Sequence, residues 1–140
     1  MGTALQTFRD IVRWETSTWN DLNSVLREKH GLPLGRYEVL QFVAAHAAVS
    51  VEEVARDLRI PAAAASALVL RLEAAGYCAN GAPTGAPDAR SIRISEDGAS
   101  LVREVERTLH NHLVAVWDQY RLGPAATEFA TQLRKRPEYY

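Results

Sequence analysis

The strongest constraint on the fold is a change of hydrophobic period at Gly76. Before it, Ser50 and Glu53 have the spacing of a capping box, which predicts a helix over about 51–58, and a second helical segment, 61–75, opens with a proline. After it, the stretch RSIRIS alternates polar and apolar residues, as a half-buried strand does. We therefore expect two short helices, a left-handed glycine cap and then a β-hairpin whose long tip is GAPTGAP.

Longer periodic segments flank this motif on both sides. Apolar residues recur at every third or fourth position over residues 5–26, which predicts a long amphipathic helix. A short helix follows the breaker HGLPLG, and after Ser95 a helix of about 25 residues is expected to end near Gly123 and Pro124, before a last helix over 125–136. The broad apolar stripes favour a second copy of the chain as a partner, with an ordinary core helix as the open alternative.

The order of these elements predicts the fold class. Three short helices followed by a hairpin are typical of a winged helix-turn-helix, in which the second helix of the pair lies in the DNA major groove and the hairpin reaches a minor groove. We expect a mainly α-helical chain with a small β-hairpin wing. Residues 33–95 would form the winged helix-turn-helix DNA-binding region, and residues 1–32 and 96–140 would form the helical dimerisation region of a homodimer.

Two stretches of the sequence carry a resemblance to a known family. VSVEEVARDLRIPAAAASALVLRLEAAGY and PDARSIRISEDGASLV, within residues 34–101, resemble the MarR family of bacterial transcriptional regulators. The second stretch contains the Asp-x-Arg-Ser wing motif, at residues 88–91. The resemblance implies a homodimeric regulator, here expected to be a repressor, that binds a pseudo-palindromic operator in double-stranded DNA and is released by a small ligand or an oxidant.

The wing motif also makes physical sense without the family. A guanidinium at a hairpin tip can enter a narrow, electronegative minor groove, and an acid two residues earlier can hold it in line by a charge-assisted hydrogen bond. We therefore expect Arg90 to contact DNA and Asp88 to orient it, with a surface ion pair as the structural alternative. Arg93 alternates outward beside two isoleucines and is a second wing candidate, for a phosphate contact.

The expected recognition helix departs from the family pattern. Members of the family usually carry several polar side chains on the groove face of this helix. Here the face opposite the predicted core presents Ala63, Ser66, Ala67 and Leu70, and only Arg71 nearby is charged. These five residues are the candidate major-groove contacts.

Three interpretations of this apolar face are open. The alanines contact thymine methyl groups and leave the remaining specificity to DNA shape and the wing, or the helix binds DNA weakly, or the face has become a protein-binding surface. The first two give a regulator with a modest or altered sequence preference. The third gives a MarR-like dimer that acts in protein or ligand binding without specific DNA binding.

Charge gives little attraction to DNA. Net charge is -1 for the chain, and five basic residues balance five acidic residues between Ser50 and Ser95. We therefore expect few phosphate contacts and a shallow dependence of DNA affinity on salt.

The resemblance also implies a small-molecule site, because family members hold ligands where the helical lobe meets the winged lobe. Trp14 and Trp19 on the first helix are candidates to stack an aromatic or phenolic ligand, and Arg13 is a candidate to pair with its carboxylate or phenolate. The alternative is that both tryptophans belong to the core of a dimer interface.

Other chemistries have little support in the sequence. Cys78 is the only cysteine and falls on the expected first wing strand, whereas the peroxide-sensing branch of the family has its cysteine near the start of the first helix. His110 and His112 are two residues apart on a helix and cannot share a metal ion. We find no catalytic spacing or phosphate loop, and expect no enzyme activity and no cofactor. With no apolar run long enough for a membrane span, we expect a cytoplasmic protein.

Overall fold

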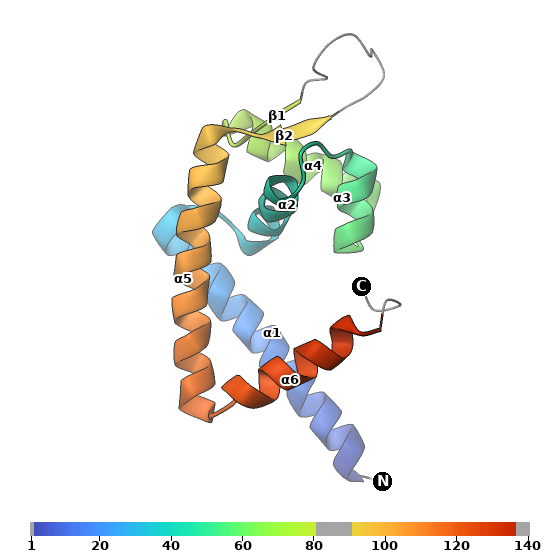
Figure 1. Cartoon of the computed structure of the whole chain (residues 1–140), viewed down its shortest axis with the longest axis vertical. Helices are drawn as coiled ribbons and strands as arrows, with labels where there is room; N and C mark the ends of the chain where they lie inside the picture. Colours follow the sequence, from blue (N-terminus) through green and yellow to red (C-terminus); the bar gives the residue numbers. More distant parts are fainter. Residues whose placement is uncertain (1, 81–90, 137–140) are drawn as a thin grey trace. The chain divides into compact units, whose positions relative to one another are not determined.

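The computed structural model describes residues 2–80 and 91–136. Within these ranges it contains helices and a two-stranded antiparallel sheet, in the order expected for a winged helix-turn-helix (Figure 1). The elements are α1 (Gly2–His30), α2 (Leu34–Ala45), α3 (Val51–Leu58), α4 (Ala62–Ala74), β1 (Cys78–Asn80), β2 (Ile92–Ile94), α5 (Glu96–Tyr120) and α6 (Gly123–Arg134). The predicted fold class, helices with a small β-hairpin wing, is confirmed. The chain divides into two compact units, Met1–Glu106 and Arg107–Tyr140.

Local capping signals define the helix-turn-helix pair, α3 and α4. The Ser50 hydroxyl accepts a hydrogen bond from the Glu53 backbone N–H at 3.1 Å, so the predicted N-cap of α3 is confirmed. Arg59 ends α3 in the left-handed conformation with φ of 55°, and Pro61, with extended backbone, is the N-cap of α4. The proline therefore stands one position before the helix that we expected it to open. Proline suits this place because its fixed φ matches the entry into a helix.

The turn after α4 connects the recognition helix to the wing. Gly76 has φ of +83°, which confirms the predicted left-handed cap. The strands then pair in the register Cys78 with Ile94 and Asn80 with Ile92. Val49, just before α3, extends this sheet through an isolated bridge to Ile92. The helix pair and the hairpin are thus joined by backbone hydrogen bonds.

Ser95 joins the wing to α5. Its hydroxyl donates to the Gly76 carbonyl oxygen at 2.6 Å and accepts from the Gly98 backbone N–H at 3.0 Å. The N-cap predicted at Ser95 is therefore confirmed, and the acids Glu96 and Asp97 lie in the positive first turn of α5.

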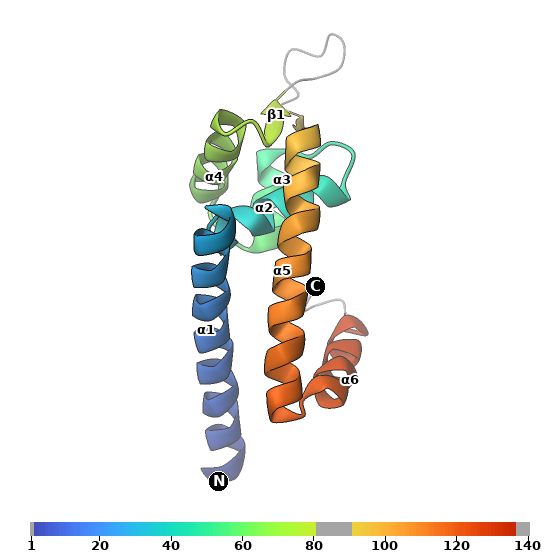
Figure 2. The ribbon, with the colours of Figure 1, turned by 90° about the vertical axis from the view of Figure 1, so that its left-hand side faces the viewer.

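The core of Met1–Glu106 lies around α2. Its fully buried side chains come from the C-terminal part of α1, from α2 to α5 and from β2, and no polar or charged residue among those described is buried. In both views α4 and the hairpin lie at the same end of the unit, whereas the N-terminal part of α1 extends away from α2 (Figure 2). Only Leu22 and Leu26 of α1 are buried. Representative fully buried residues are Leu26, Leu40, Val43, Leu72, Ile92 and Val105.

The predicted helix of about 25 residues ending near Gly123 and Pro124 is confirmed, because α5 has 25 residues and ends at Tyr120. One expectation is corrected: the last helix was expected over 125–136, but Gly123 and Pro124 already belong to its first turn, and α6 ends at Arg134. The reason is that a proline in the first turn of a helix loses no hydrogen bond. Arg121, with φ of 54°, makes the turn, and the Leu122 N–H bonds to the Trp117 carbonyl oxygen at 2.8 Å.

Candidate nucleic-acid interface

The two faces of α4 differ in burial as the sequence predicted. Ala65, Val69 and Leu72 are buried, which fixes one face of the helix against the core. The opposite face is exposed, and its most prominent side chain is Leu70, which is 57 % exposed. The structure places the five candidate residues on or beside this outward face: Ala63, Ala67, Leu70 and Arg71 are exposed, and Ser66 is half-buried.

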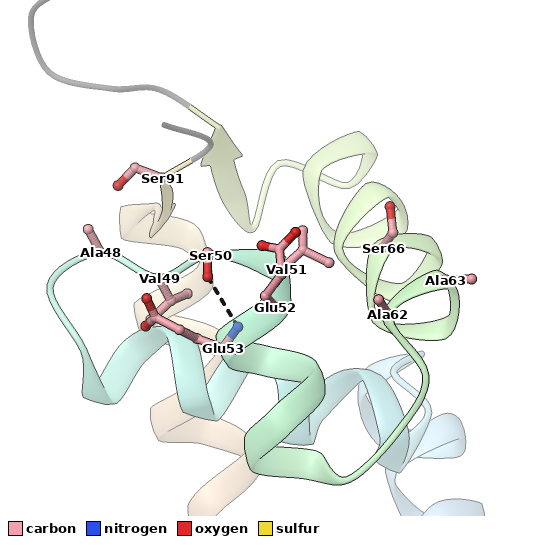
Figure 3. Close-up of a pocket in the computed structure, with 10 residues that line it drawn as sticks. All are labelled: Ala48, Val49, Ser50, Val51, Glu52, Glu53, Ala62, Ala63, Ser66 and Ser91. Carbon is pink, nitrogen blue, oxygen red and sulfur yellow. Dashed lines mark hydrogen bonds between the residues drawn. The ribbon is translucent and has the colours of Figure 1, made fainter. Parts of the chain in front are cut away.

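Beside α4 lies a hollow of about 630 Å³. It is bordered by the N-terminus of α3, the first turns of α4 and the start of β2, as the close-up shows (Figure 3). Three hydroxyl groups and two carboxylates line it, together with alanine and valine side chains. The polar lining residues are Ser50, Glu52, Glu53, Ser66 and Ser91. The sequence had indicated Ser50 and Glu53 as capping residues only, because nothing in the spacing showed that Ser91, just before β2, would border the same hollow.

The charges near this surface are mixed. Glu52 and Glu53 are exposed in the first turn of α3 and are the charged side chains that line the hollow. Because the first helix of a helix-turn-helix crosses the DNA backbone, these carboxylates would repel phosphates there. Arg71 on α4 and Arg93 on β2 are exposed and can contact phosphates. The cations Arg71 and Arg93 are thus offset by the carboxylates of Glu52 and Glu53.

The wing residues are only partly described. Arg93 is exposed between buried Ile92 and half-buried Ile94, so the alternation predicted for this strand is confirmed. Asp88 and Arg90 fall within residues 81–90 and lie outside the described residues. Their assignment to DNA contact stays a prediction.

The candidate ligand residues lie on the exposed part of α1. Trp14 and Trp19 are 36 % and 43 % exposed, and Arg13 is exposed as well. Because they are five residues apart on a helix, the two tryptophans point to directions about 140° apart. A single chain therefore does not bring both rings to the same ligand. The 630 Å³ hollow is lined by none of the three residues.

Cys78 has the surroundings of a structural thiol. It is buried, and its Sγ lies 3.9 Å from the Val69 carbonyl oxygen. Burial, with a smaller contribution from the charge of Glu73, raises the pKa of the Cys78 thiol to about 11. A thiol with so high a pKa carries almost no thiolate at neutral pH, and the thiolate is the reactive form.

The described part of the chain holds neither a cluster of metal-ligating residues nor a membrane-spanning helix. No group of three or more His, Cys, Asp or Glu residues there is arranged to hold a metal ion. His110, which is exposed on α5, and His112 belong to no such group. None of the described helices is long and apolar enough to cross a membrane.

Comparison with known proteins places the fold. No protein-family model matches the sequence, and no curated protein matches it. The structure is similar to the transcriptional regulator BldR from Sulfolobus solfataricus, with a TM-score of 0.77, 17 % identity and 96 % of each chain covered. It is also similar to a MarR/EmrR family transcriptional regulator from Acinetobacter sp. ADP1, with a TM-score of 0.77, 13 % identity and both chains covered in full.

A third similar structure is that of a MarR family protein from Mycobacterium tuberculosis in complex with DNA. It gives a TM-score of 0.72 at 21 % identity and covers 91 % of this chain and 94 % of that one. The likeness extends through both terminal helices as well as the winged helix, which confirms at the level of the fold the resemblance seen in the sequence motifs. The chain has the fold of the MarR family of transcriptional regulators.

Proposed function

We propose that this protein is a transcriptional regulator without enzymatic activity, which binds operator DNA as a homodimer and acts as a repressor. The observation that carries the proposal is the outward face of α4, exposed beside the wing in a chain that has the MarR fold over its whole length. A protein of similar fold, from Mycobacterium tuberculosis, has been crystallised with DNA. In such a fold the second helix of the pair is the element that enters the major groove.

The proposed DNA contacts divide into three kinds. The face of α4 reads bases in the major groove, Arg90 enters the minor groove with Asp88 holding it in line, and Arg93 contacts a phosphate. The exposure of the α4 face and of Arg93 supports these roles. The residues assigned to α4 are Ala63, Ser66, Ala67, Leu70 and Arg71.

Large apolar side chains on the terminal helices support the homodimer. Phe8 on α1 and Phe129 on α6 are 61 % and 59 % exposed, and they stand among other exposed apolar residues. A monomer in water rarely leaves so many large apolar groups uncovered, so we assign residues 1–32 and 96–140 to the dimer interface. Light scattering is expected to give twice the 15.5 kDa of one chain, and a monomer at micromolar concentration would contradict this assignment. The exposed residues are Leu5, Phe8, Ile11, Val12, Trp14, Trp19, Val114, Tyr120 and Phe129.

An aromatic carboxylate is the proposed effector class. The Mycobacterium tuberculosis protein of similar fold has been crystallised with salicylic acid and with p-aminosalicylic acid. On this chain Trp14 or Trp19 would stack the ring and Arg13 would pair with the carboxylate. Titration with salicylate should quench tryptophan fluorescence in the wild type and in only one of the variants Trp14→Phe and Trp19→Phe. Equal quenching in both variants would contradict the assignment to a single ring.

A mobility-shift assay at low salt tests the main proposal. The probe is the DNA upstream of the protein's own gene, and the proteins are the wild type, Arg90→Ala and, as a matched control, Arg36→Ala on α2, which lies outside the assigned DNA contacts and the dimer region. We expect the wild type and the control to shift the probe and Arg90→Ala to bind more weakly. The absence of any shift would favour the second candidate function, protein or ligand binding through α4, whose support is the apolar character of its exposed face. A shift that Arg90→Ala leaves unchanged would remove the wing mechanism.

A further inference from the structure

We propose that α4 recognises its operator through the C5-methyl groups of thymine, with Ala63, Ala67 and Leu70 as the specificity-determining residues. The inference rests on the proposed DNA-binding function and states which chemical group of the DNA that function reads.

The three residues form one stripe on the outward face of α4. They are spaced four and three residues apart, which aligns side chains along one side of a helix. All three are exposed, and the helix buries its opposite face through Ala65 and Val69. The stripe therefore has the position of a base-reading surface and carries no hydrogen-bonding group.

The polar residues of α4 lie to either side of the stripe. Ser66 is half-buried and lines the hollow beside α3. Arg71 is exposed on the other flank, where a long side chain can reach a phosphate at the edge of the groove. Because both polar residues lie at the sides of the face, the side chains at its centre that would meet the base edges are those of the apolar stripe.

Only one apolar group is available to such a surface in the major groove. Guanine, cytosine and adenine present hydrogen-bond donors and acceptors there, whereas thymine adds the C5-methyl group. Alanine and leucine side chains gain free energy by removing this methyl from water. Against a G·C pair the same side chains would exclude water from polar edges without supplying hydrogen bonds, which disfavours that pair. The burial of the thymine methyl and the unfavourable desolvation of a G·C pair thus both favour thymine at the contacted position.

The fold does not require these residues to be apolar. Leu70 is more than half exposed and the two alanines are exposed, so their contacts contribute little to the core. Glu52 and Glu53 line the hollow that Ala63 also borders, and their charges weaken general attraction to phosphates. A larger share of the binding free energy must then come from contacts with the bases.

The test begins with a duplex selected by the wild-type protein from a pool of random sequences. The selected duplex is synthesised again with deoxyuridine in place of thymine, which removes only the methyl groups. We expect affinity to fall about fourfold for each contacted methyl, and about fifteenfold for two. A ratio near one between the two duplexes would overturn the inference while leaving the DNA-binding function standing. If no duplex is enriched, the proposed function itself fails.

Variants locate the effect on the stripe. Leu70→Ala keeps a good helix former at an exposed position and should still bind DNA. The thymine-to-uracil affinity ratio should fall about fourfold for each methyl that Leu70 contacts, and so about fifteenfold when the residue is changed in both subunits of the dimer. Ala67→Ser should also reduce the ratio, whereas Ala75→Ser, at the exposed C-cap of α4, is the matched control and should leave it unchanged. An unchanged ratio in Leu70→Ala and Ala67→Ser would overturn the assignment of these residues.

Discussion

Replacing Gly98 by alanine should destabilise the protein, although alanine is normally the better helix residue. Gly98 lies in the first turn of α5, where the helix passes close to the backbone that leads into the wing. An added Cβ would overlap the Tyr77 carbonyl oxygen and lie 2.9 Å from Ile94 Cγ1. The carbonyl oxygen is also held in place, because it accepts the Ser95 backbone N–H at 3.0 Å. The helix therefore has to shift away from the hairpin.

The expected change in the free energy of unfolding of Gly98→Ala is the difference between two opposing effects. At an unobstructed helical position, Gly→Ala stabilises by about 1 kcal/mol. Overpacking a close contact destabilises by about 1 to 3 kcal/mol, and contact with backbone places Gly98 at the upper end of this range. The net loss of unfolding free energy should therefore be about 1 to 2 kcal/mol.

Gly35→Ala provides the matched control. Gly35 is also in the first turn of a helix, α2, but no atom lies within 4 Å of its added Cβ. This variant should be neutral or more stable by up to about 1 kcal/mol. Urea unfolding followed by circular dichroism measures both variants against the wild type. A Gly98→Ala protein as stable as the wild type would refute the close approach of α5 to Tyr77.

Three further predictions concern charge and chemistry. Changing Glu52 and Glu53 to glutamine should raise DNA affinity about threefold per charge in a low-salt titration, because the two carboxylates no longer repel phosphates. An unchanged affinity would show that these residues lie away from the DNA backbone. Burial, and then the charge of Asp57, raises the pKa of Glu38, so the ionised carboxylate disfavours the folded state above that pKa. Glu38→Gln should therefore stabilise the protein at pH 7, and the gain in unfolding free energy should disappear as the pH falls and the wild-type carboxyl becomes protonated. If urea unfolding gave the same gain at every pH, the charge of Glu38 would not be its cause. Cys78 should react with a thiol reagent only after unfolding, since its buried thiol has a pKa of about 11, and fast labelling of the folded protein would contradict its burial.

The elements that could be predicted from sequence are those defined by short-range chemistry. The Ser50 cap and the left-handed Gly76 depend on atoms within a few residues of each other, so the residue types alone indicated both. The alternation around Arg93 likewise followed from the period of a strand. These local signals were enough to give the order of elements and hence the fold class.

Features that depend on approach between distant segments could not be predicted. The contact of Gly98 with Tyr77 and the hollow between α3 and β2 require the tertiary fold. Pro124 was ambiguous, because proline both follows helices and opens them, and only the start of α6 decides between the two. For the candidate site, the outward face of α4 was predictable from the buried face, whereas the position of the carboxylates beside it was not.

Hydroxyl-radical footprinting of the selected duplex tests the central claim most directly, since it reports both DNA contact and the symmetry of the bound protein. A homodimer with one α4 in each of two major grooves should protect two symmetric patches whose centres are about one helical turn, or 10 base pairs, apart or a multiple of it. Protection of a single patch would contradict the account, and so would the absence of protection at protein concentrations well above those at which the dimer forms.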